Sequence, residues 1–121
     1  MSLRDKSDRL MEEAIKDLEC GCYNKAVSAA YFSVRTLAEH VIRGLRTSKD
    51  DKIANALKRS LLNYASEEEA ERFRAIYLSL FEARKRADHR PFMFNREDAE
   101  FYLRLAREIR EKLLWIERKI S

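Results

Sequence analysis

The sequence predicts an all-α fold, an up-and-down bundle of four long helices with an additional, shorter helix. Its 121 residues include only two glycines and one proline, fewer than a chain rich in strands and loops would need. Charged residues make up 38% and hydrophobic residues 45%, a balance typical of helices with solvated outer faces. Apolar residues also recur at spacings of three and four, the period of a helix with one buried face.

We expect a single domain over residues 1–121, because a chain of this length builds one hydrophobic core. No apolar run reaches the roughly 18 residues that a membrane span needs, so no membrane association is expected. Cys20 and Cys22 lie too close together to staple the fold, which predicts reduced thiols in a cytoplasmic protein. Without a further ligand cluster we expect no metal site and no cofactor. The net charge of +4 is compatible with a nucleic-acid partner but also occurs without one.

The first two helices are placed by their end signals and small residues. Ser2, followed three residues later by an aspartate, predicts the start of the first helix, and Gly21 predicts its end. The second helix is expected to run from residue 23 or 24 to about Leu45. A strip of small residues should let another helix approach it closely. The strip consists of Ala26, Ala29, Ala30 and Ser33.

The third and fourth helices follow from similar capping patterns. Ser48 is the predicted cap of a shorter third helix, which should run from Asp50 to about Tyr64. Ser66 and Glu69 have the spacing of a capping box, so we expect the fourth helix to begin there.

The fifth helix should begin after Asn95, and its apolar arc is unusually wide. Phe101, Leu105 and Trp115 fall outside its main stripe, which is commoner for a helix buried on two sides than for a surface helix. The apolar segment 92–94 just before it should fold onto the bundle or onto a partner chain. Together these features predict a homodimer.

The end of the fourth helix carries the candidate functional residues. Its apolar stripe includes Tyr77, Leu80 and Ala83, and Arg84 lies at the edge of that stripe. Pro91 disfavours helical geometry at the preceding residue, so the helix should end near His89. The partial negative charge at a helix C-terminus favours a cation there. An arginine and a histidine one turn apart therefore form a candidate anion-binding pair.

From the residues alone, structural alternatives remain for this pair. Arg84 can form a salt bridge with an acidic residue of a neighbouring helix. His89 can act as a helix C-cap residue that uses its charge locally. The other histidine, His40, is expected to be structural.

Two segments resemble a known family. Residues 84–89 have the form R-x4-H at the end of a fourth helix, and residues 23–34 form an alanine- and aromatic-rich second helix. With the five-helix pattern, they resemble the prokaryotic HEPN domain, which is often encoded beside a small MNT nucleotidyltransferase. The resemblance covers essentially the whole chain.

The resemblance implies a metal-independent endoribonuclease, the HEPN toxin of a HEPN–MNT toxin–antitoxin pair. Such a protein acts on RNA as a homodimer whose two motifs face one cleft. Arg84 would stabilise the phosphorane and His89 would be the general base or acid, roles that suit a guanidinium and an imidazole. Lys85, Arg86 and Arg90 would contact phosphates of single-stranded RNA.

A second function remains open, and two positions of this sequence depart from the pattern that is usual in the family. The alternative is a non-catalytic helical module that binds RNA or a nucleotide and partners a nucleotidyltransferase. Lys85 occupies a position where active members often have a small polar residue. Pro91 replaces a tyrosine that the partner enzyme can modify in many members, so the resemblance does not imply that mode of control here.

The spacing of the motif sets a geometric condition. Five residues at about 100° each place the side chains of Arg84 and His89 roughly 140° apart around a regular helix. They converge only if the last turn unwinds before Pro91, or if each site takes one residue from each subunit.

Overall fold

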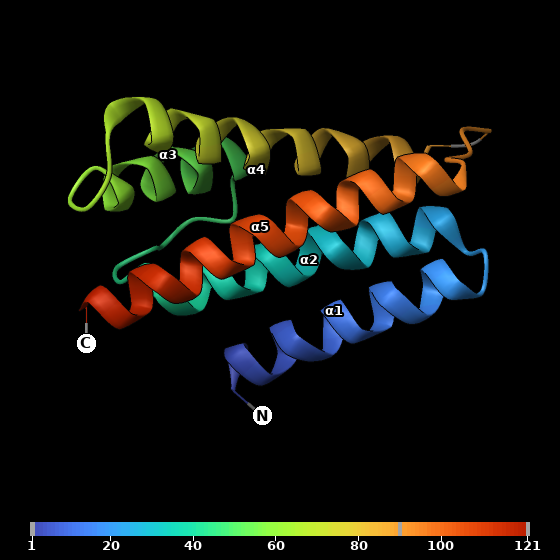
Figure 1. Cartoon of the computed structure of the whole chain (residues 1–121), viewed down its shortest axis with the longest axis horizontal. Helices are drawn as coiled ribbons and strands as arrows, with labels where there is room; N and C mark the ends of the chain where they lie inside the picture. The colour runs from blue at the N-terminus through green and yellow to red at the C-terminus, as the bar shows by residue number, and fades with distance from the viewer. Residues whose placement is uncertain (1, 90, 121) are drawn as a thin grey trace.

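The computed structural model describes residues 2–89 and 91–120, and this part of the chain forms five α-helices (Figure 1). Their bounds are α1 Leu3–Glu19, α2 Tyr23–Val41, α3 Asp50–Leu61, α4 Glu67–Ala87 and α5 Arg96–Ile120. Four helices have 17 to 25 residues and α3 has 12. The predicted class, an all-α bundle with one shorter helix, is confirmed.

Helix α2 lies at the centre of the bundle. It packs against α1, α4 and α5, and α3 packs against α4. In Figure 1, α2 and α5 run in one direction while α1 and α4 run in the other. The C-terminus of α4 and the N-termini of α2 and α5 therefore meet at one end of the molecule.

Three of the predicted helix starts are confirmed by their caps. Ser2 Oγ accepts a hydrogen bond from the backbone N–H of the third residue on, at 3.0 Å. Ser66 Oγ does the same for Glu69, at 3.1 Å. Asn95 Oδ1 accepts from the N–H of Asp98 at 2.8 Å, and the Asp98 carboxylate accepts in return. Each cap satisfies a backbone donor that has no partner within its helix.

The predicted ends of α2 and α3 were too late. Helix α2 ends at Val41 rather than near Leu45, because Ile42 adopts an extended backbone. Gly44 follows with φ +78°, a left-handed conformation that glycine adopts without steric cost. Helix α3 ends at Leu61, and Tyr64 is 42% exposed instead of lying on the buried face.

The predicted cap of α3 was also wrong. The N-cap residue is Lys49, and no side chain caps the helix. Ser48 instead contributes its backbone carbonyl, which accepts a hydrogen bond from Arg35 Nη2 at 2.9 Å. A contact from α2 therefore shapes the loop before α3.

The small-residue strip of α2 packs closely against α1, as predicted. Ser7 Oγ donates to the carbonyl of Ser33 at 2.6 Å, and Ser33 Oγ donates to the carbonyl of Ser7 at 3.0 Å. Both serines are fully buried. Their reciprocal hydrogen bonds require the two helix backbones to approach closely, which only small side chains permit.

A buried carboxyl group connects three helices on the other side of α2. The hydroxyl of Tyr31 in α2 donates to Asp50 in α3, and the hydroxyl of Tyr77 in α4 donates to the same oxygen at 2.7 Å. Arg35 Nη1 lies 3.9 Å from the second carboxyl oxygen. Both tyrosines are fully buried, so the network satisfies polar groups that water does not reach.

The two tyrosines remain hydrogen-bond donors over the physiological pH range. Burial, reinforced by Asp50, raises the pKa of Tyr31 to about 12. Burial also raises the pKa of Tyr77. Because the folded-state values lie above the usual value of about 10, this stabilisation is complete below pH 10 and is lost as the pH rises further.

Among the described residues, no helix is both long and apolar enough to span a membrane. Cys20 and Cys22 are exposed and form no disulfide.

We predict that Asp50→Ala lowers the free energy of unfolding by roughly 3 kcal/mol, because it leaves two buried hydroxyls unpaired at about 1–3 kcal/mol each. Asp51→Ala is the matched control, since Asp51 also lies in the first turn of α3 but is exposed. Its change should stay within about 0.5 kcal/mol. Denaturant melts of both variants measure the difference, and equal losses would contradict a special role for Asp50.

Candidate active site

Arg84 is held against the surface of α2. Its side chain is 33% exposed, and its guanidinium carbon lies 5.0 Å from the ring centre of Phe32 and 5.8 Å from that of Tyr31. Arginine stacks well on aromatic faces, where the ring attracts the cation. The rings therefore restrict the guanidinium to one orientation at the end of α4.

Asp88 provides the charge partner of Arg84. Arg84 Nε lies 3.0 Å from Asp88 Oδ2, one helical turn further on. That nitrogen is buried, and its N–H is not aligned with the oxygen, so the two groups form an ion pair without a hydrogen bond. The sequence left open a salt bridge to a neighbouring helix, and the pair forms at the end of Arg84's own helix instead.

The two terminal nitrogens of the Arg84 guanidinium form an outer fork that no other described residue occupies. Among the described residues, the two terminal nitrogens of Arg84 have no hydrogen-bond partner, since its only polar contact is through Nε. A guanidinium can donate two parallel hydrogen bonds to the oxygens of a phosphate. The arginine is thus oriented by protein contacts and still able to bind an anion.

His89 lies just beyond the helix. Helix α4 ends at Ala87 with Asp88 as its C-cap, and the His89 N–H bonds to the carbonyl of Arg86 at 3.0 Å. This bond spans three residues, so the last turn is tightened and the 140° separation of a regular helix does not apply to His89. The C-cap role considered for His89 belongs to Asp88.

The imidazole of His89 is exposed at the surface. Within residues 2–89 and 91–120, its side chain makes no hydrogen bond or ion pair, and none joins it to Arg84. One chain therefore places Arg84 and His89 at the same end of α4 without connecting them.

The neighbouring basic residues differ in how they are held. Arg86 Nη2 donates to the hydroxyl of Tyr102 in α5 at 2.8 Å and lies near the rings of Phe92 and Phe94. Lys85 is exposed, with its amine 3.5 Å from Glu82. Both remain at the surface beside the motif. Arg90, the third predicted phosphate contact, lies outside the described residues.

The sequence prediction missed Asn24, which fixes the connection that follows His89. Asn24 Nδ2 donates to the carbonyls of Ala87 at 3.1 Å and Phe92 at 2.9 Å. Its Oδ1 accepts from the N–H of Phe94 at 2.9 Å. One side chain thus satisfies three backbone groups on either side of His89. No sequence pattern indicates this role, because the partners are 63 to 70 residues away.

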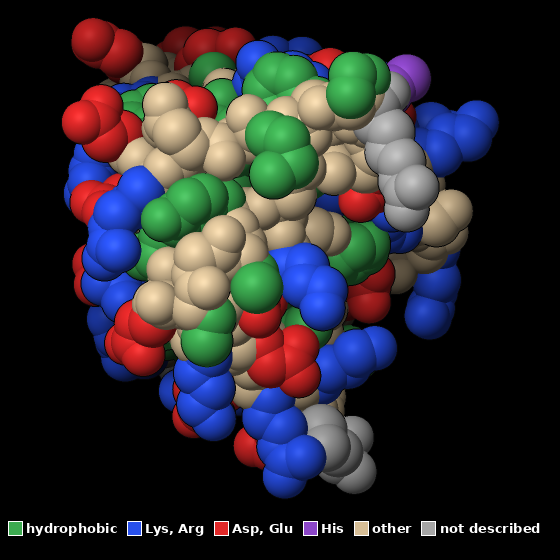
Figure 2. Space-filling model, turned by 90° about the vertical axis from the view of Figure 1, so that its right-hand side faces the viewer, with side chains coloured by type: hydrophobic (Ala, Val, Ile, Leu, Met, Phe, Trp, Pro, Cys, Tyr) green, Lys and Arg blue, Asp and Glu red, His purple; other side chains and the backbone are tan. Residues whose placement is uncertain are grey.

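The connection is anchored at one end and apolar at its surface. Phe94 is buried against Val27, Ala83 and Ala99, as expected for a segment that folds onto the bundle. Phe92 and Met93 are 38% and 80% exposed. Figure 2 shows this end of the molecule, where hydrophobic side chains gather on the surface with both basic and acidic side chains around them.

The fold and the site define a five-helix bundle with an arginine and a histidine at the end of its fourth helix. The model of the HEPN domain family matches residues 1–118. The chain therefore belongs to the HEPN domain family, as the sequence predicted. A comparison with curated proteins gave no significant match.

We predict that Asn24→Asp loosens the connection after His89. The carboxylate replaces the amide donor, so the carbonyls of Ala87 and Phe92 lose their partner, at a cost of about 1–2 kcal/mol in unfolding free energy. Hydrogen exchange at the Phe94 amide should also become faster. Asn63→Asp makes the same chemical change at an exposed asparagine and should leave both values unchanged. Equal effects of the two substitutions would contradict the prediction.

Proposed function

We propose that this protein is a metal-independent endoribonuclease. The observation that carries the proposal is the fork of Arg84, which is oriented by Phe32 and Asp88 but has no hydrogen-bond partner among the described residues, beside the exposed His89. HEPN domains occur in ribonucleases and in nucleotide-binding modules. Both classes bind phosphate groups, for which the guanidinium fork is suited.

The chemistry needs a proton acceptor and a stabiliser of negative charge. His89 takes the proton from a ribose 2′-hydroxyl, and the 2′-oxygen attacks the adjacent phosphorus. Arg84 stabilises the charge of the phosphorane that forms. The P–O5′ bond then breaks, and the leaving oxygen takes a proton from an imidazolium or from water. The products are a 2′,3′-cyclic phosphate and a 5′-hydroxyl.

A second copy of the chain would complete the site. Phe92, Met93 and Phe101 are large apolar side chains that remain exposed near the end of α4, more than a monomer needs at one site. Burying them between two copies would bring both motifs to one interface. Each copy then supplies a histidine, one as base and one as acid. We further propose that the protein is the toxin of a HEPN–MNT pair.

We predict that the protein is a dimer at micromolar concentration, burying more than about 1,000 Å². Met93→Asp should give a monomer, because it places a charge in the apolar contact. Leu62→Asp introduces the same charge at a side chain that is 43% exposed, in the turn after α3, and should leave the dimer intact. Light scattering measures the mass, and a monomeric wild type would contradict the dimer.

We predict that His89→Ala abolishes cleavage of a labelled single-stranded RNA and removes the bell-shaped pH dependence of the rate. Arg84→Lys keeps the charge but loses the fork, so its rate should fall by on the order of 100-fold. Cleavage by the wild type should continue in EDTA. Expression of the wild type, but not of His89→Ala, should arrest bacterial growth if the protein is a toxin.

Two matched substitutions control for nonspecific effects on activity. His40→Ala removes the other histidine, which pairs with Glu117 rather than with the site, and Arg72→Lys makes the same change elsewhere on α4. Both should retain activity. If the wild type binds RNA without cleaving it and the His89 and Arg84 variants bind equally well, the non-catalytic module is the better account.

A further inference from the structure

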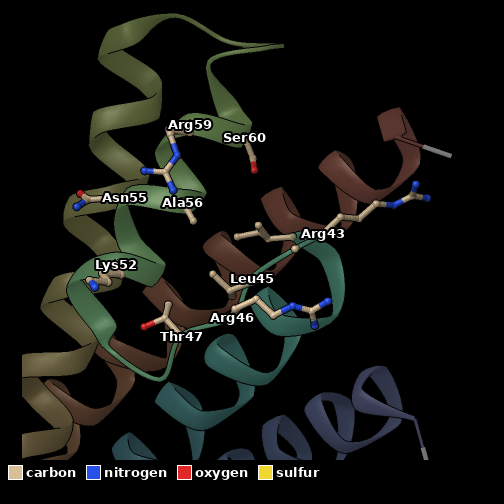
Figure 3. A pocket seen from close by; sticks show the side chains of 11 residues that line it. Arg43, Leu45, Arg46, Thr47, Lys52, Asn55, Ala56, Arg59 and Ser60 are labelled. Atoms are coloured by element: carbon tan, nitrogen blue, oxygen red, sulfur yellow. The ribbon is translucent and has the colours of Figure 1, made fainter.

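A cavity of about 540 Å³ lies between α3 and the connection that joins α2 to α3, residues 42–49 (Figure 3). It is at the opposite end of α2 from Asn24, and Phe32, which contacts Arg84, lies about midway along the helix. Because Phe32 is ten residues before Ile42, the cavity is about 15 Å from the level of Arg84 along the helix axis, at 1.5 Å per residue. The cavity is therefore separate from the Arg84–His89 site.

The lining of the cavity contains four basic residues and no acidic one. Arg43, Arg46, Lys52 and Arg59 line it, and none of its lining residues is an aspartate or glutamate. In the described part of the chain, none of these four side chains has an ion-pair or hydrogen-bond partner. Lys58, next to Arg59 on α3, is by contrast paired with Glu67 at 2.9 Å and Glu71 at 2.8 Å. Because its lining holds basic and no acidic residues, the cavity carries a net positive charge, which attracts an anion.

The helix period and one glycine create this arrangement. Lys52 and Arg59 are seven residues apart, so they lie on the same face of α3. The positive φ of Gly44 turns the chain between Arg43 and Arg46. Figure 3 shows Lys52 and Arg59 on the α3 side of the cavity and Arg43 and Arg46 on the loop side.

The distribution of the cations indicates an extended ligand. In Figure 3 the side chains of Arg43 and Arg46 extend away from α3 instead of converging with Arg59 on one point. A compact anion needs converging donors, whereas a chain of phosphates suits charges spread over a surface. No lining residue is aromatic, so the cavity offers bases no stacking platform, and its cations suit the phosphates instead.

We propose that this cavity, the α2–α3 basic pocket, binds the phosphate backbone of RNA outside the cleavage site. The assignment rests on the proposed function, because it takes the ligand to be the same RNA that the Arg84–His89 site would cleave. A strand held at both sites crosses about 15 Å, roughly four stacked nucleotides at about 3.4 Å each. The pocket therefore favours long RNA over short RNA.

The test is RNA binding by the full chain, with Arg46→Ala and Arg59→Ala combined. All proteins carry His89→Ala so that RNA stays intact, and fluorescence anisotropy with a labelled 20-nucleotide single strand measures affinity at several salt concentrations. The double variant should bind on the order of tenfold more weakly. The slope of log affinity against log salt should become shallower by about 1.4, since each lost phosphate contact removes about 0.7. A dinucleotide, too short to reach both sites, should show a smaller loss.

The matched control is Lys6→Ala with Arg9→Ala, which removes the same charge from the exposed face of α1. It should bind the 20-nucleotide strand as the parent does. Equal losses of affinity in the two double variants would overturn the assignment of the pocket, because the effect would then come from net charge alone. Unchanged affinity on removal of Arg46 and Arg59 would also overturn it.

Two further measurements separate the pocket from its alternatives. Displacement of the long strand by ATP at an equal phosphate concentration would assign the pocket to a mononucleotide and overturn the RNA assignment. Cleavage is measured separately with His89 intact. If the wild type cleaves RNA and the double variant binds RNA as tightly as its parent, the pocket assignment is rejected and the proposed nuclease function is not. Weaker binding by the double variant with no cleavage by the wild type would support the pocket and reject the nuclease.

Discussion

The structure depends on one constraint, the burial of α2 on nearly all of its sides. A surrounded helix exposes few groups to water, so each polar side chain that it carries needs a partner on another helix. Ser33 pairs with α1, Tyr31 shares Asp50 with α4, and Asn24 bonds to the connection between α4 and α5. These three contacts fix the positions of the other helices relative to α2, and Phe32 on the same helix orients Arg84.

The candidate active site combines one fixed group with one free group. Arg84 is restrained by stacking and by Asp88, so in the proposed function it would need little reorganisation to bind a phosphate. His89 is exposed and has no partner that would fix its ring among the described residues. Such a division suits a site in which the charge stabiliser is prepared by the monomer and the proton carrier is positioned by substrate or by a second chain.

How far the sequence predicted the structure depends on the distance over which each interaction acts. The caps at Ser2, Ser66 and Asn95 were predicted because their partners are three residues away. The buried stripe of α4 followed from helix periodicity, and it placed Arg84 correctly at the edge of the core. The predicted cap at Ser48 was wrong because the N-cap position falls one residue later, at Lys49, while the Ser48 carbonyl bonds to Arg35 of α2, a contact that no local pattern indicates. Asn24 was missed for the same reason, since its three partners become neighbours only in the folded chain.

The hydrogen bonds of Asn24 also set an order of events during synthesis. Asn24 is synthesised before its partners Ala87, Phe92 and Phe94. The hydrogen bonds on either side of His89 therefore form only after residue 94 has been synthesised. A chain truncated before residue 94 would lack the contacts that hold this segment against α2.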